Sequence, residues 1–219
     1  MALSRRALIA SLPSIAIATS AKAYENCYPQ FVQGIGPTTI CDVGIDLGKL
    51  AEAEDPQFAS QWCWAASVSN IFDLYGFEVS QATIVQTVYG QLVNLPAFDT
   101  TTISRLLSRD WNDESGKSFR CRIRGIFDAY SGASTLDNRR IISALRSERP
   151  LLFCNRSHAM VLTAMTYTQT PMGPFVLNVG FFDPWPGRGL RGPDHPLEAH
   201  PVHSGGHMTY LALPEITPL

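Results

Sequence analysis

The order of hydrophobic patterns along the chain constrains its fold more than any other feature. Four segments show helical spacing of apolar residues or helix-capping signals: residues 63–74, 80–90, 102–111 and 137–146. Four later segments are short runs rich in β-branched and aromatic residues: residues 151–154, 158–167, 175–182 and 208–213. Residues 168–173 contain a proline and a glycine and form the turn between two of these runs. Helices followed by an antiparallel sheet predict an α+β fold rather than a doubly wound one.

The N-terminus has the pattern of an export signal. Arg5 and Arg6 precede an apolar stretch that ends in an Ala-Lys-Ala cleavage pattern, which predicts a signal peptide over residues 1–23. The pair of arginines also resembles a twin-arginine signal, and the choice between the two export routes stays open. An uncleaved anchor is the alternative, although the apolar stretch is short for a membrane span. We therefore expect a periplasmic or secreted protein with no membrane contact after cleavage.

The rest of the chain divides into an arm and a domain. Residues 24–54, with several prolines and glycines, are predicted to form an irregular N-terminal arm, and residues 55–219 a single domain. The full chain has 17 basic and 19 acidic residues, and removing the leader leaves 17 − 3 = 14 basic residues and a net charge of −5. No basic cluster alternates with aromatic residues, so we expect no nucleic-acid partner.

Five cysteines bear on both compartment and chemistry: Cys27, Cys41, Cys63, Cys121 and Cys154. In an oxidising compartment thiols tend to pair, and an odd number leaves at least one outside intramolecular bridges. Cys27 and Cys41 flank a short segment and can close one loop, and Cys121 and Cys154 lie in two predicted strands that a bridge can join if they are neighbours. This pairing leaves Cys63 as the reactive thiol, but four cysteines allow three connectivities.

Cys63 lies in the sequence QWCWAAS, at the predicted start of a helix. Unpaired backbone N–H groups and the helix dipole favour a thiolate at that position, which suits a nucleophile. The alternative is a buried core thiol, since free cysteine is among the most buried residues. The two flanking tryptophans are predicted to pack around the thiol rather than to contact substrate.

A nucleophilic thiol needs a base and a group that orients the base. His158 stands between a polar turn and an apolar strand, where its ring can face a cleft. Asp183 ends the strand that follows the His158 strand after a short turn. In an antiparallel hairpin, the end of the second strand lies beside the start of the first. We therefore predict that Asp183 orients His158 and that His158 is the base for Cys63.

Short motifs surround these three residues. Cys-Trp-Ala begins at Cys63, His-Ala-Met-Val-Leu begins at His158, and Asp-Pro-Trp begins at Asp183. Over residues 55–187 these motifs resemble the papain-like cysteine peptidase superfamily, most closely its short bacterial branches, the bacteriocin-processing and avirulence-effector-like peptidases. The resemblance implies a papain-like α+β fold, in which an N-terminal helical part with a central, nucleophile-bearing helix packs on a C-terminal antiparallel β-sheet.

The resemblance also implies two supporting residues. Trp185 would cover the contact between the histidine and its orienting residue. Gln57, six residues before the cysteine, would donate its amide to the oxyanion hole, with Gln61 as the alternative. Two departures from the family pattern are the Gln-Trp pair before Cys63, where the family has Gly-Ser, and a longer gap between histidine and aspartate.

These features predict an exported cysteine peptidase that acts on a peptide or protein substrate and needs no cofactor. Two rival functions use the same residues differently: acyl transfer or amide hydrolysis with the same triad, and an inactive binding module. Four histidines near the C-terminus fit no zinc-binding spacing, so we expect no metal site there; they are His195, His200, His203 and His207.

Overall fold

The computed structural model describes residues 22–34, 36–53 and 55–219. Almost all of the predicted signal peptide, residues 1–21, lies outside the described residues. Within the described part of the chain, the helices are all too short or too polar to cross a membrane.

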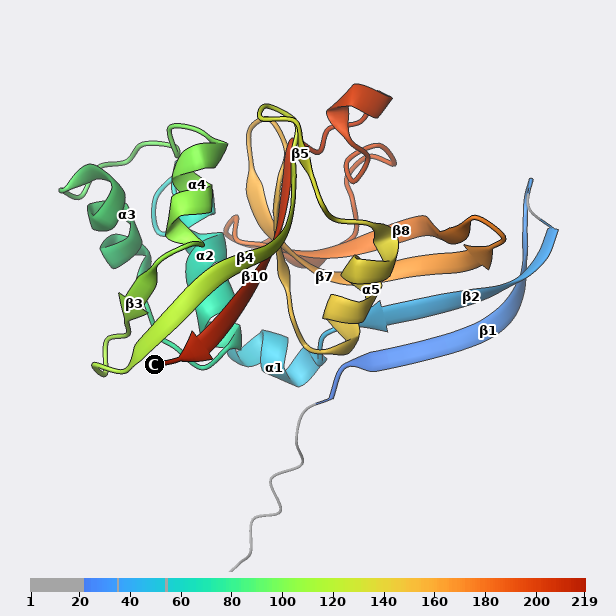
Figure 1. Cartoon of the computed structure of the whole chain (residues 1–219), viewed down its shortest axis with the longest axis horizontal. Helices are drawn as coiled ribbons and strands as arrows, with labels where there is room; N and C mark the ends of the chain where they lie inside the picture. Colours follow the sequence, from blue (N-terminus) through green and yellow to red (C-terminus); the bar gives the residue numbers. More distant parts are fainter. Residues whose placement is uncertain (1–21, 35, 54) are drawn as a thin grey trace, which may run out of the picture.

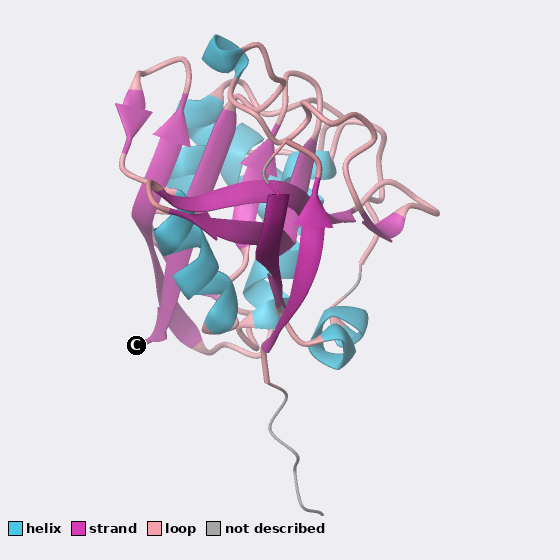
Figure 2. Ribbon diagram, turned by 90° about the vertical axis from the view of Figure 1, so that its right-hand side faces the viewer, coloured by secondary structure: helices cyan, strands magenta, loops and turns pink. Residues whose placement is uncertain are grey.

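A strongly twisted sheet of ten strands dominates the described chain, with the path β1-β2-β7-β6-β10-β4-β3. Strand β8 pairs with β7 and β9, and β5 pairs with β4. All pairings between these strands are antiparallel, and strands at one end of the sheet run across those at the other (Figure 2). The strands are β1 (Tyr24–Val32), β2 (Gly36–Gly44), β3 (Asp110–Asn112), β4 (Ser118–Asp128), β5 (Ala133–Ser134), β6 (Leu151–Cys154), β7 (Ala159–Thr170), β8 (Gly173–Asp183), β9 (Gly189–Arg191) and β10 (Tyr210–Pro218).

The described helices are short. They are α1 (Leu47–Glu52), α2 (Cys63–Leu74), α3 (Gln81–Tyr89), α4 (Thr100–Leu106), α5 (Asn138–Arg146) and one 3₁₀ turn, Val202–Ser204. Helices α2, α3 and α4 gather at one end of the molecule, and the β1–β2 and β7–β8 hairpins extend at the other (Figure 1). Helix α2 packs against β6, β7 and α3, and almost every one of its residues is buried. The central position of α2 fixes Cys63 at the edge of the core.

The predicted fold class is wrong. The chain does not begin with a helical part that packs on a C-terminal sheet, as the papain-like expectation required: β1 and β2 precede every described helix, and β3, β4 and β5 lie between helices. The sheet joins strands that are far apart in the sequence, because the C-terminal β10 inserts between β4 and β6. Short strands that complete a sheet through such distant partners leave a weak local signal, since their stability comes from pairing and burial.

The segment predicted as an irregular arm is largely regular. Strands β1 and β2 pair as a hairpin, and β2 continues the sheet by pairing with β7 from Ala164 to Thr168. Pro29 fits because β1 is an edge strand, where one missing N–H donor is tolerated. Gly34 and Gly36 have φ values of 83° and 94°, which suits glycine at the hairpin turn.

Three of the four predicted helices have the expected bounds within about two residues, and side-chain caps mark the start of two of them, α3 and α5. The Ser80 hydroxyl accepts from the Thr83 amide at the start of α3, and Gly90 ends that helix at φ 71°. The Asp137 carboxylate accepts from the Arg140 amide at the start of α5. The predicted helix over residues 102–111 is wrong in its second half, because residues 110–112 pair with β4 as β3.

The cysteines follow the prediction only in part. Cys27 and Cys41, opposite each other on β1 and β2, form a disulfide. The predicted Cys121–Cys154 bridge is wrong: both thiols are free and buried in the described structure. Cys121 lies on β4 and Cys154 on β6, and β10 runs between these strands. The disulfide is consistent with an oxidising, non-cytoplasmic compartment.

Candidate active site

Cys63 is the first residue of α2, and its thiol is free and partly exposed. The capping residue Trp62 makes no side-chain hydrogen bond to the helix start. The first backbone N–H groups of α2, beside Cys63, therefore have no side-chain acceptor from the capping residue. Positive potential from these groups favours a negative charge at the Cys63 sulfur.

The two tryptophans beside Cys63 are structural, as predicted. Their side chains are buried, and each indole N–H donates to a carbonyl of the loop after α3: Trp62 to Val93 over 2.8 Å and Trp64 to Leu95 over 3.2 Å. They therefore fix the start of α2 against that loop and hold the Cys63 backbone in place.

His158 lies at the end of a tight loop before β7. The Asn155 side-chain oxygen accepts hydrogen bonds from the backbone amides of Ser157 and His158, over 2.9 and 2.8 Å. The Thr209 hydroxyl donates to the carbonyls of Cys154 and Asn155 at the other side of the loop, both over 3.1 Å. The loop is thus held at both ends, and the His158 side chain is 19% exposed.

The β7–β8 hairpin brings Asp183 to His158, as the sequence predicts. Val161 pairs with Phe182, so the end of β8 lies beside the start of β7. His158 Nε2 and Asp183 Oδ1 are 2.6 Å apart, and the same oxygen accepts from the Trp185 backbone amide over 3.0 Å. The Asp183 side chain is 1% exposed.

The Cys63 side chain lies close enough to the His158 ring to contribute to the rise of the His158 pKa. Because Nε2 contacts Asp183, Nδ1 is the ring nitrogen left to face Cys63. Burial acts to lower the pKa of His158, but the hydrogen bonds to Asp183 and then Cys63 outweigh it and raise the pKa to about 9. At neutral pH the ring is therefore an imidazolium that faces the Asp183 carboxylate.

Asp183 is held as an anion. Burial acts to raise its pKa, yet hydrogen bonds from His158, the Trp185 amide and Arg191 lower the pKa to about 2. Arg191 Nε donates to Asp183 Oδ2 over 2.8 Å, so the two carboxylate oxygens have different partners. The carboxylate is a fixed charge across the working pH range of most enzymes.

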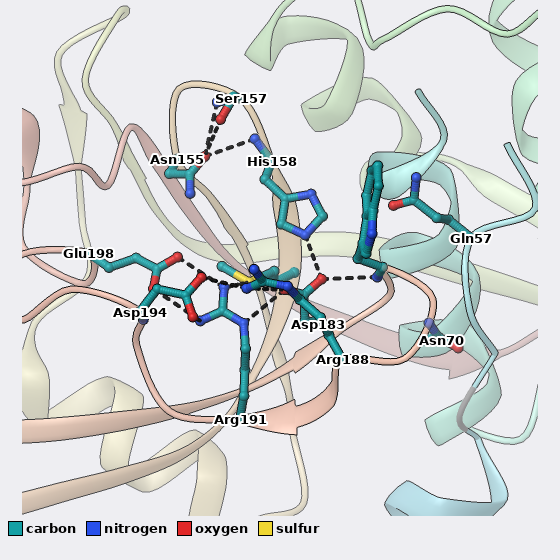
Figure 3. A network of polar contacts seen from close by, with 12 residues as sticks. Gln57, Asn70, Asn155, Ser157, His158, Asp183, Arg188, Arg191, Asp194 and Glu198 are labelled. Carbon is teal, nitrogen blue, oxygen red and sulfur yellow. Dashed lines mark hydrogen bonds and ion pairs between the residues drawn. The ribbon is translucent and has the colours of Figure 1, made fainter. Parts of the chain in front are cut away.

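Sequence reasoning missed the pair that lies behind Asp183. Arg191, on β9, donates from Nη1 and Nη2 to the two carboxylate oxygens of Glu198, each over 3.1 Å. Both side chains are almost fully buried, at 12% and 6% exposed. Figure 3 shows Arg191 between Asp183 and Glu198. No motif marks either residue, and only the pairing of β9 with β8 brings Arg191 to Asp183.

Gln57 is buried beside the site, as an oxyanion-hole residue would be. Its backbone amide donates to the Pro184 carbonyl over 2.7 Å, which joins the loop before α2 to the segment after Asp183. Its side-chain Nε2 donates to the Ala59 carbonyl over 2.9 Å, while Oε1 is buried and has no hydrogen-bond partner among the described residues. Rotation about the last side-chain bond would exchange these two atoms. Gln61, the alternative, is exposed, and its backbone amide donates to Asn94.

Two buried amides hold the loop that carries Gln57. Asn70, on α2, accepts from the Asp55 amide and donates to the Asp55 carbonyl, each over 3.0 Å. Gln81, on α3, donates to the Pro56 carbonyl over 2.9 Å and accepts from the Phe58 amide over 3.1 Å. No local sequence pattern predicts these clamps, because only the packing of α2 and α3 on the loop brings the groups together.

Trp185 lies over the His158 ring edge to face, with ring centres 6.5 Å apart. Its side chain is 47% exposed, so it covers one side of the His158–Asp183 contact while facing solvent on the other. This position agrees with the role that the motif resemblance implies.

A cavity of about 540 Å³ opens beside the loop before His158. Its wall includes Cys154, Asn155 and Arg156 of that loop and two exposed aromatic side chains, Phe98 and Tyr130. The volume is in the range of sites that take a drug-sized or peptide side-chain ligand. The loop that carries His158 therefore borders an accessible space, although neither Cys63 nor His158 lines it.

The C-terminal histidines form no metal-binding group with acidic or thiol ligands in the described structure. His195 and His207 stack with ring centres 5.4 Å apart. The cluster of possible ligands found among the described residues is Glu25, Cys27 and Cys41, and the disulfide removes both thiolates.

No protein-family model matches the chain, and no curated protein sequence matches it.

Proposed function

We propose that this protein is an exported cysteine peptidase that hydrolyses peptide bonds with Cys63, His158 and Asp183. The observation that carries the proposal is the 2.6 Å contact between His158 Nε2 and the buried Asp183 carboxylate, with the free Cys63 thiol close enough to influence the His158 ring. A thiol at a helix start, paired with an oriented imidazolium, is an activated nucleophile.

In the first half-reaction, the Cys63 thiolate attacks the peptide carbonyl carbon and the carbonyl electron pair moves to oxygen. The backbone N–H of Cys63 and the Gln57 NH₂ group, which must first leave the Ala59 carbonyl, stabilise this oxyanion. The carbonyl then re-forms, the C–N bond breaks, and the His158 imidazolium gives its proton to the departing amine. The product is a thioester between substrate and Cys63.

In the second half-reaction, neutral His158 removes a proton from water, and the resulting hydroxide attacks the thioester carbon. The C–S bond breaks, Cys63 leaves as a thiolate and His158 is again protonated. Asp183 holds the imidazole in one orientation through both steps. The disulfide and the leader pattern support a periplasmic or secreted location for this activity.

The test is cleavage of a mixed peptide library by the purified mature protein, with products identified by mass spectrometry. Cys63→Ala should abolish cleavage and leave thermal unfolding unchanged, while the matched control Cys121→Ala should keep cleavage because that thiol is far from the site in the core. Cleavage by Cys63→Ala would refute the nucleophile assignment. Transfer of added amines onto glutamine-containing peptides, without hydrolysis, would instead support the acyl-transfer alternative.

A further inference from the structure

Asp183 is the only member of the triad whose two polar atoms must both accept hydrogen bonds. Oδ1 accepts from His158 Nε2 and from the Trp185 amide. Oδ2 accepts from Arg191 Nε over 2.8 Å. Each of these partners is an N–H donor, since an arginine and a backbone amide have no other role and His158 is protonated.

We propose, on the basis of the triad proposed above, that Arg191 braced by Glu198 is the positioning residue that fixes Asp183 and restricts residue 183 to a carboxylate. An asparagine has the same shape but only one oxygen. With Arg191 present, its NH₂ group must face either the arginine Nε–H or the pair of donors at the Oδ1 position. Both arrangements set donors against donors in a buried site, where an unmet hydrogen bond is costly.

Glu198 is what makes Arg191 rigid. Its two oxygens take both terminal nitrogens of the guanidinium in a bidentate pair, and one of them also accepts from the Asp194 amide over 2.8 Å. Arg191 Nη2 contacts the Met160 sulfur at 2.9 Å, and the guanidinium lies 5.6 Å from the Phe181 ring centre. The guanidinium therefore cannot swing away to relieve a conflict at residue 183.

Other charges near Asp183 do not duplicate this arrangement. Arg188 Nη1 lies 3.7 Å from Asp183 Oδ2, and its side chain is 46% exposed and paired with Asp194. His158, Arg188 and Arg191 are the charged groups that reach Asp183, with Asp194 and Glu198 beyond them (Figure 3). Arg188 is thus a matched control: the same residue type in the same segment, without the short buried contact.

The experiment compares Asp183→Asn, Arg191→Met and the double variant by the rate at which iodoacetamide alkylates Cys63 between pH 5 and 10. We expect Asp183→Asn to slow alkylation at neutral pH about tenfold or more, as for loss of a charge-assisted hydrogen bond. Adding Arg191→Met should recover most of that loss, because the asparagine can then turn its oxygen to His158. Arg188→Met should have no such effect.

A double variant that alkylates no faster than Asp183→Asn would overturn the proposal. If Arg191→Met fails to fold because Glu198 is left buried and unpaired, the variant Arg191→Met/Glu198→Met replaces the whole ion pair with apolar side chains, an exchange that proteins often tolerate. The same comparison applies in that background. Thermal unfolding identifies any variant whose result reflects instability.

Alkylation reports thiol activation without a peptide substrate, so the two proposals can fail separately. Recovery in the double variant together with no peptide cleavage by the unmodified protein would refute the peptidase and keep the positioning role. Peptide cleavage by the unmodified protein, without recovery of the alkylation rate in the double variant, would keep the peptidase proposal and refute the positioning role.

Discussion

Removal of the Asp183 carboxylate should shift the pH range over which the site works. The pKa of His158 is raised to about 9, against an ordinary value of 6.5, and the hydrogen bond that His158 donates to Asp183 is the largest influence that raises it. That difference is worth about 3 kcal/mol of preference for the imidazolium. In Asp183→Ala, burial is opposed by the Cys63 contact alone, so the pKa should fall to about 6.5 or below.

The change in the pKa of His158 changes the protonated fraction of its ring at a fixed pH. A group with a raised pKa keeps its proton until the pH passes that value, so the unmodified protein should lose activity only as the pH rises through about 9. At pH 7.5 about 97% of His158 is protonated with a pKa of about 9, but only about 9% with a pKa of 6.5. The imidazolium that protonates the leaving amine would therefore be largely lost.

The assay is kcat/KM for a cleaved peptide, together with Cys63 alkylation, from pH 5 to 10. The expected result is an alkaline limb near pH 9 for the unmodified protein and more than two pH units lower for Asp183→Ala. Asp194→Ala is the matched control, since that exposed aspartate pairs with Arg188 rather than His158. An alkaline limb that stays near pH 9 in Asp183→Ala would refute the reasoning.

Three further predictions concern the surroundings of the triad. Gln81→Leu should release the loop that carries Gln57 and lower kcat without changing the Cys63 alkylation rate; equal loss of both would contradict an oxyanion role for that loop. Cys27→Ser should lower the free energy of unfolding by about 3 kcal/mol, as expected for a bridge over 14 residues, and leave kcat unchanged, as chemical denaturation and peptide assays would show. Cys121 and Cys154 should resist iodoacetamide until the protein unfolds, because burial raises the pKa of both thiols; labelling of either in the native state would contradict the packing.

Local signals were enough to predict which residues lie together at the candidate site. Helix α2 was predictable from its apolar spacing, and the position of Cys63 at its start followed from the motif. The turn between β7 and β8 was enough to bring Asp183 beside His158, because a hairpin's geometry depends on adjacent sequence. The Cys27–Cys41 disulfide was predictable for the same reason, since both residues belong to one hairpin.

The sequence by itself therefore determined the three residues of the candidate triad and the elements that carry them, since each signal lies within one helix or one hairpin. Only the tertiary structure decided the sheet, in which β10 separates β4 from β6 and keeps Cys121 apart from Cys154. It also decided the Arg191–Glu198 pair and the clamps on the Gln57 loop. These contacts join segments whose pairing depends on burial and on distant partners. A short stretch of sequence does not predict which distant segment it will pair with.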